Sequence, residues 1–131
     1  MQLTIPVAPG ELLDKLTILE IKAERIEQPD KLANVQRELE LLTSVWDQAR
    51  LENERIAALR TQLRQVNESL WQIEDDIREE ERHGRFGERF IELARSVYVT
   101  NDRRAAIKKA INVELGSVIV EEKSYRDYRG D

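Results

Sequence analysis

The sequence predicts an all-α protein, an antiparallel bundle of four or five helices with short extended termini. Two observations lead to this class. Apolar residues recur at alternating spacings of three and four through most of the chain. Glycine and proline number only 5 and 3 among 131 residues, at positions that separate the periodic segments. The length predicts a single domain, residues 1–131, and the content of 36% charged residues suits thin amphipathic helices.

The chain begins with an extended segment and a helix that is apolar on two faces. QLTIPV alternates weakly and ends in Pro6, which is typical of an edge strand or an extended arm. A helix is expected over residues 10–27. One of its faces carries Leu12, Leu16, Leu19, Ala23 and Ile26, and the opposite face carries Asp14, Ile18, Ile21 and Arg25. Isoleucines on the second face predict that this helix is covered on both sides, by another helix or by another subunit.

No glycine or proline interrupts the helical pattern between Asp30 and His83. Pro29 ends the first helix, and Asp30 is expected to cap the second, whose apolar row is Leu32, Val35, Leu39, Leu42 and Trp46. A single helix over this range would be about 80 Å long, which exceeds a compact domain of this size. The apolar phase also slips across RLENER, so a break is expected near residues 48–54.

The third segment has the most regular pattern in the chain. Its apolar row alternates strictly between spacings of three and four: Ile56, Leu59, Leu63, Val66, Leu70, Ile73 and Ile77. A parallel dimeric coiled coil is one interpretation, but the flanking positions carry no complementary ladder of charges. An antiparallel bundle, within one chain or between two, fits the wide apolar face better. Gly84 is expected to end this helix.

Two further helices and an extended tail are expected after Gly87. The first is short and carries Phe90, Leu93, Ala94 and Val97. Thr100 or Asn101 caps the second, which buries Ile107, Ile111 and Leu115. The tail SVIVEEKSY has an extended pattern and is expected to pair with the segment at residues 2–7 in a two-stranded ribbon.

Composition excludes several classes of chemistry. The chain has no cysteine, so disulfides, thiolate nucleophiles and cysteine-containing zinc sites are excluded. No signal peptide and no apolar run of about 18 residues is present, so we expect a cytoplasmic protein without membrane contacts. The net charge of −5 argues against general nucleic-acid binding. Residues 82–109 nevertheless carry a net charge of +5, which would attract an anionic partner to one region.

Polar side chains follow two of the predicted helices beside their apolar rows. Asn67, Trp71, Glu74 and Arg78 form one stripe in NESLWQIEDDIR, and Asn101, Arg104, Lys108 and Asn112 form a second row on the last helix. If the two helices are neighbours, the rows line one groove in which Arg78, Arg104 and Lys108 could hold a phosphate, pyrophosphate or carboxylate. The alternative is an ordinary solvated helix edge, in which Glu74 and Arg78 only form a surface pair.

The sequence contains no complete catalytic set. ERIE at residues 24–27 matches the first half of the paired-acid motif of helical nucleotide pyrophosphohydrolases, but no E-x-x-D follows at a suitable distance. The E-x-x-H pairs of di-iron bundles are lacking, and His83 lies in a turn without triad partners. We therefore assign no catalytic residue, no metal site and no cofactor, and we leave enzymatic activity open while favouring a non-catalytic role.

Three stretches resemble a family of small bacterial proteins described only as a domain of unknown function. They are IPVAPGELLDKLTILEIK, VNESLWQIEDDIR, and ARSVYVTNDRRAAIKKAIN with the following VEEKSY. The last two are also similar to a second uncharacterised helical family with an N-x-x-L-W-x-x-E-D pattern. The resemblance implies that the characteristic residues are Asn67, Trp71, Glu74, Asp75, Arg78, Asn101, Asp102 and Arg103. It also implies an association with enzymes of surface-polysaccharide synthesis.

Two hypotheses about function follow. The leading one is a non-catalytic binding or assembly protein that forms a homodimer, because the first helix is apolar on two faces and the third has regular heptads. The alternative is a small enzyme or sensor that acts on a nucleotide, nucleotide sugar or phosphosugar. In that case Trp71 would stack on the ligand, the cations of the groove would hold its anionic group, and Glu74 or Asp75 would act as base or magnesium ligand.

Overall fold

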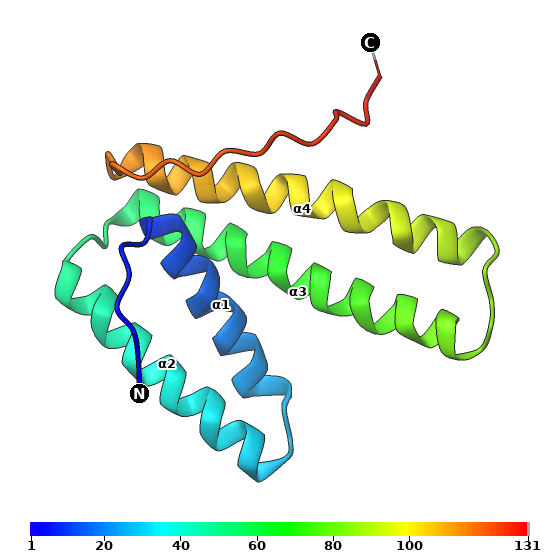
Figure 1. Ribbon diagram of the computed structural model, residues 1–131, viewed down its shortest axis with the longest axis horizontal. Helices are drawn as coiled ribbons and strands as arrows, with labels where there is room; N and C mark the ends of the chain where they lie inside the picture. The colour runs from blue at the N-terminus through cyan, green and yellow to red at the C-terminus, as the bar shows by residue number, and fades with distance from the viewer. Residues whose placement is uncertain (131) are drawn as a thin grey trace.

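The computed structural model describes residues 1–130 and contains four helices. They are α1 (Pro9–Arg25), α2 (Pro29–Ala49), α3 (Glu54–Arg82) and α4 (Glu88–Glu114), and the described residues contain no strand. In Figure 1, α1 and α2 form one antiparallel hairpin, and α3 and α4 form a second, longer hairpin that crosses the first obliquely. The predicted all-α class is confirmed, and the number of helices is four.

The break between α2 and α3 lies where the sequence predicts it. Arg50 ends α2 in the left-handed conformation with a φ of 53°. Asn53 then caps α3, since its side-chain oxygen accepts a hydrogen bond from the backbone N–H of Ile56 at 2.8 Å. The prediction that Asp30 caps α2 is wrong. Gln28 occupies that position and Pro29 begins the helix, so Asp30 lies in the first turn.

The predicted interruption of the last helix near Thr100 is also wrong, because α4 is continuous. The residues of α4 that form its inward row are spaced alternately by four and three along the whole row: Leu93, Val97, Thr100, Arg104, Ile107 and Ile111. Thr100 is buried within this row and Arg104 occupies the next position of it. Two polar residues in successive core positions resemble the end of one helix and the cap of another, which explains the error.

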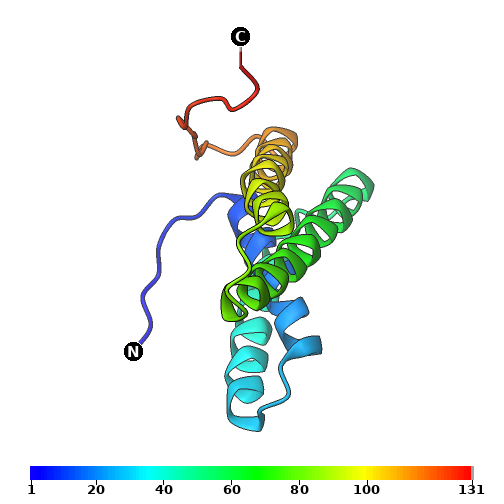
Figure 2. The same cartoon turned by 90° about the vertical axis from the view of Figure 1, so that its right-hand side faces the viewer.

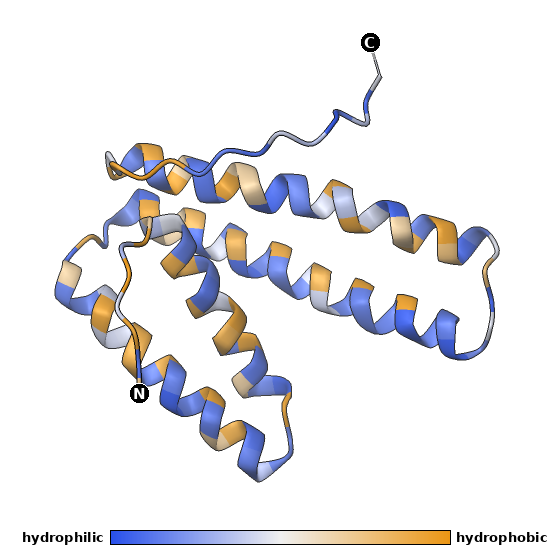
Figure 3. Ribbon diagram, in the orientation of Figure 1, coloured by the Kyte–Doolittle hydropathy of each residue, from blue (hydrophilic) through white to orange (hydrophobic). Residues whose placement is uncertain are grey.

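The core lies where α1 meets the other three helices. α1 is the one helix that approaches all three others closely. The buried cluster comprises Leu12, Leu13, Leu16, Trp46, Ile56, Leu59, Leu63 and Ile111. Figure 3 shows apolar residues along the facing sides of the helices. The second face of α1 is covered within the same chain, since Ile21 is buried there. The two-faced pattern of α1 is therefore explained without a second subunit.

Extended segments leave the helical body at both ends of the chain. Residues 1–7 precede α1, and residues 117–130 follow α4. The tail crosses back over α4, where Lys108 lies 3.6 Å from Glu121 and the Tyr98 and Tyr128 rings are 5.1 Å apart. Among residues 1–130 the two segments do not pair, so the predicted ribbon is not confirmed within one chain. None of the helices in this range has the length and apolar character needed to span a membrane.

Candidate functional site

A groove of about 490 Å³ lies where α1 meets the α3–α4 hairpin, and we call it the junction groove. It is lined by Ile18 and Lys22 from α1; by Asn67, Leu70, Trp71, Glu74, Asp75 and Arg78 from α3; and by Val97, Asn101 and Arg104 from α4. Seven of the ten predicted site residues therefore lie together, with Ile18, Leu70 and Val97 supplying apolar surface between them.

Trp71 is the one aromatic residue of the junction groove. Its indole is half-buried, and the guanidinium of Arg25 lies over the ring at 5.8 Å from the centroid. Trp46 differs, because it is fully buried in the core and its Nε1 donates a hydrogen bond to Glu52 at 2.8 Å. The Trp71 ring is thus the indole that a molecule in the groove could contact directly.

Beneath the groove lies a buried carboxylate that the sequence analysis did not select. The side chain of Asp14 is 1% exposed. Asn67 donates from Nδ2 to Asp14 Oδ1 at 2.9 Å and to Thr17 Oγ1 at 3.0 Å. The Thr17 hydroxyl in turn donates to the backbone oxygen of Asp14 at 2.9 Å. The side-chain amide of Asn67 therefore joins α3 to α1.

Arg104 completes the coordination of Asp14 from α4. Its Nε donates to Asp14 Oδ1 at 2.9 Å, and its Nη2 donates to Oδ2, which makes the pair bidentate. The hydrogen bonds to Asp14 raise the pKa of Arg104 above its ordinary value, although burial opposes them. The Arg104 side chain remains 30% exposed, and its Nη1 makes no hydrogen bond within residues 1–130. Arg104 is a structural cation that also lines the groove.

Three polar contacts join α1 to α4 in an antiparallel ladder. Gly10 donates its backbone N–H to Asn112 Oδ1 at 2.8 Å, Lys108 donates to Glu11 at 2.6 Å, and Arg104 pairs with Asp14. The members on α4 are spaced by one helical turn. Gly10 is required at the first contact, since a Cβ there would lie 2.5 Å from the Lys108 carbonyl oxygen.

Lys108 belongs to this ladder and not to the junction groove. Burial is the largest single influence on its pKa and lowers it. The hydrogen bond to Glu11 and the charges of Asp14, Glu11 and Glu121 outweigh burial, so that the pKa lies above its ordinary value. The prediction that Arg78, Arg104 and Lys108 line one groove is therefore corrected. Lys108 instead lines a separate depression of about 450 Å³ beneath the tail, which includes Arg104 as well.

Asp102 and Arg103 lie apart from the junction groove. Both line a third surface depression, between α4 and the tail, together with Tyr125. Asp102 pairs there with Lys123. These two residues are neighbours of Asn101 in sequence, but successive helical residues point about 100° apart. The structure therefore does not unite them with Trp71.

Three polar side chains of the junction groove carry no ion pair or hydrogen bond to another residue within 1–130: Lys22, Asp75 and Asn101. Arg78 pairs only with Glu74, at 3.1 Å and with both side chains largely exposed. The sequence predicts that the face of α1 with Asp14 and Ile18 is covered by another helix or subunit, but it does not assign Ile18, Lys22 or Asp14 to the site. One signal could have identified Asp14: it shares a face of α1 with isoleucines that need cover.

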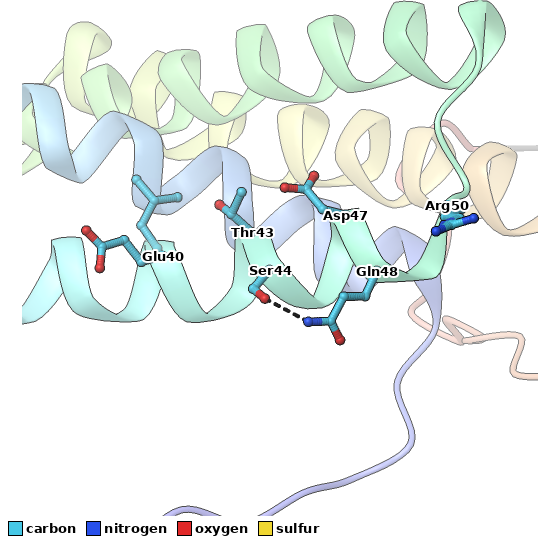
Figure 4. Close-up of a pocket in the computed structure, with 7 residues that line it drawn as sticks. Glu40, Thr43, Ser44, Asp47, Gln48 and Arg50 are labelled. Atoms are coloured by element: carbon cyan, nitrogen blue, oxygen red, sulfur yellow. Dashed lines mark hydrogen bonds between the residues drawn. The ribbon is translucent and has the colours of Figure 1, made fainter.

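Another depression, of about 590 Å³, lies along α2 (Figure 4). It is lined by Leu39, Glu40, Thr43, Ser44, Asp47, Gln48 and Arg50. Gln48 donates to Ser44 at 3.1 Å, as the dashed line in Figure 4 shows. All of these residues come from one helix and its C-cap, so no second element supplies an opposing wall. Residues 1–130 contain no group of three or more His, Cys, Asp or Glu side chains that could hold a metal ion.

A family model described as "Family of unknown function (DUF6165)" matches residues 1–128. No curated protein and no solved structure matches the chain. The match spans the junction groove, the α1–α4 ladder and nearly all of the tail. The chain therefore belongs to this family of unknown function.

Proposed function

We propose that this protein is a non-catalytic binding protein whose junction groove takes a small ligand with an anionic group and a planar or apolar part. The observation that carries the proposal is the half-buried Trp71 in the same groove as Lys22 and Asn101, which have no partner of their own within residues 1–130. An indole offers a flat apolar surface, while an ammonium and an amide fix an anionic or hydroxylated end.

The helices that form the groove are joined by hydrogen bonds in the absence of a ligand. Asn67 and Arg104 both bind Asp14, so the walls from α3 and α4 are tied to α1 by the same carboxylate. A preorganised site loses less conformational entropy on binding than a mobile one. Arg104 lines the groove, but its Nε and Nη2 groups are taken by Asp14, so it is an auxiliary contact and Lys22 is the principal cation.

The charges of the groove favour a ligand of modest charge. Lys22, Arg78 and Arg104 oppose Glu74 and Asp75, and Asp14 already neutralises Arg104. A bare inorganic phosphate would find little net attraction here. A nucleotide sugar or phosphosugar fits better, because its apolar or hydroxylated part contacts Trp71, Asn101 and the apolar wall.

A catalytic role on the same ligand is the second candidate. Asp75 is the observation that favours it, since this carboxylate lines the groove without a cationic partner within residues 1–130. A free carboxylate beside a bound ligand can accept a proton or bind magnesium. If the protein converts a ligand to product and Asp75→Asn abolishes this turnover, the catalytic role is supported in place of the non-catalytic one.

Thermal unfolding in the presence of a ligand panel tests the proposal. Nucleotides, nucleotide sugars and phosphosugars are each added with and without magnesium. A ligand at about 100 times its dissociation constant stabilises the folded state by about 2.7 kcal/mol, which corresponds to roughly 8 °C in a chain of this size. Binding should also change the fluorescence of Trp71.

Matched variants locate the site. Lys22→Met and Trp71→Phe should abolish or strongly weaken the stabilisation. Lys15→Met, an equivalent change at an exposed position of α1 outside the groove, should leave it unchanged. The proposal fails if no panel member stabilises the protein, or if the Lys22 and Trp71 variants bind as well as the Lys15 variant.

A further inference from the structure

The segment at residues 1–7, which we call the arm, presents a row of apolar side chains to solvent. Leu3 is 84% exposed, Ile5 70% and Val7 39%, and the three alternate along an extended backbone. Figure 2 shows the arm standing away from the helices, and Figure 3 shows its apolar colouring. An extended apolar segment without cover is a template for strand pairing with another chain.

The backbone of the arm is also unpaired. The backbone hydrogen bonds outside the helices begin at Glu11, whose N–H bonds the carbonyl oxygen of Ala8. Ala8 and Gly10 are buried, and the Gly10 N–H is held by Asn112. The end of the arm that joins α1, which we call its root, is therefore held in place. The backbone N–H and C=O groups of the arm itself have no backbone hydrogen-bond partner within residues 1–130.

The tail offers a segment of matching apolar composition from the same end of the molecule, in which the Ser117 hydroxyl accepts from the Ile119 N–H at 3.2 Å and donates to the Ile119 carbonyl oxygen at 2.7 Å. Residues 117–120, SVIV, carry no charged side chain, as is true of residues 2–7. Val118 is 98% exposed and Val120 is also exposed. Asn112 ties both roots, because its side chain accepts from Gly10 and its carbonyl oxygen accepts from the N–H of Ser117. The two segments begin together and then diverge within one chain (Figure 1).

We propose that the arm pairs with residues 117–120 of a second copy of this chain. Two copies related by a twofold axis would exchange arms, and each arm would cover the apolar start of the partner's tail. The pairing is closed and self-complementary, as a twofold dimer requires. Because residues 2–7 and 117–120 have no charged side chains, their pairing buries no charged side chain. Binding of a highly charged partner at the same surface would not be favoured in this way. This interface is independent of the junction groove.

The proposed contact is small. The arm, residues 117–120 and the exposed Val113 together supply about a dozen residues from each copy, against about 20–30 in a standard interface. The interface therefore lies at the low end of specific contacts. We expect a dimer with a dissociation constant in the micromolar range that is fully formed near 100 µM.

Sedimentation equilibrium of the full chain from about 1 to about 100 µM tests the dimer. The wild-type protein should shift from monomer to dimer over this range. The double variant Leu3→Asp with Ile5→Asp should remain a monomer throughout, and circular dichroism should show unchanged helix content, since the arm lies outside the core. Leu41→Asp with Val45→Asp places the same charge on exposed residues of α2 and should dimerise normally. A monomeric wild type, or a dimeric arm variant, overturns the proposal.

Cross-linking tests which segments meet. The chain has no cysteine, so introduced thiols have no background. A Thr4→Cys chain mixed with a Val118→Cys chain should form a mixed disulfide on oxidation, since paired strands bring their Cα atoms within the range a disulfide needs. Disulfides only between two Thr4→Cys chains would show that arms pair with arms. Arm-mediated binding of the monomer to lipid vesicles would show a membrane as the occupant. Either result overturns the arm–tail pairing.

Discussion

Replacing Arg104 by methionine should destabilise the protein by about 3 kcal/mol. The substitution keeps an unbranched side chain in the inward row of α4 but leaves the carboxylate of Asp14, which is 1% exposed, without its bidentate partner. Removing one partner of a buried pair costs about 3–5 kcal/mol. The lower end applies here because Asn67 still donates to Asp14, and because the Lys108 ammonium lies 3.8 Å from it. The total stability of a typical domain is only about 5–15 kcal/mol.

Urea unfolding and thermal scans measure this loss, which corresponds to a fall in Tm of roughly 10 °C. The control is Arg82→Met, because Arg82 is largely exposed and lies 3.9 Å from Glu79. That variant should lose less than about 1 kcal/mol. The double variant Asp14→Asn with Arg104→Met should be more stable than Arg104→Met alone, because no unpaired charge is then buried. If Arg104→Met behaves like the control, or if the double variant is the less stable, the assignment of Asp14 as a buried anion is refuted.

Two further predictions concern close packing and pH. Gly10→Ala places a Cβ 2.5 Å from the Lys108 carbonyl oxygen and should lose about 1–3 kcal/mol in urea unfolding. Gly87→Ala, which meets no atom within 4 Å, should lose less than about 1 kcal/mol, and equal losses would contradict the close approach of α1 to α4. The hydrogen bond from Arg85 lowers the pKa of Glu80 below its ordinary 4.5, so its stabilisation is present above pH 4.5 and is lost as the pH falls through the folded value. The difference in urea midpoint between wild type and Glu80→Gln should therefore shrink below that pH, and a constant difference would exclude the ion pair.

The helices that the sequence predicts well are those defined by local signals. The break at residues 50–53 was predicted from the slip of apolar phase, and the α3 row from its unbroken heptads. The continuity of α4 was not predictable in this way. Arg104 fits its inward row because α1 provides a carboxylate to it, and that contact joins residues 90 positions apart.

The same distinction explains the candidate site. The stripe around Trp71 was predicted because residues three and four apart on one helix share a face. Its union with Asn101 and Arg104 required only that α3 and α4 be neighbours, and the short turn between them makes them so. The contribution of Lys22 depends on how one hairpin docks on the other. No spacing within a single helix encodes that angle.

The α1–α4 ladder determines the register of α1 along α4, which apolar packing alone would not. Leucines and isoleucines of similar size would tolerate a shift of α1 along α4 by one turn, since the apolar rows repeat at that interval. A shift of that kind that placed Asp14 opposite Thr100 would also move Gly10 away from Asn112. The Asp14 carboxylate would then be buried without Arg104, and the uncharged hydroxyl of Thr100 could not neutralise it. The ladder therefore fixes the register of the two hairpins, and with it the position of Lys22 in the junction groove. It also fixes the place next to Asn112 from which the arm and the tail both extend.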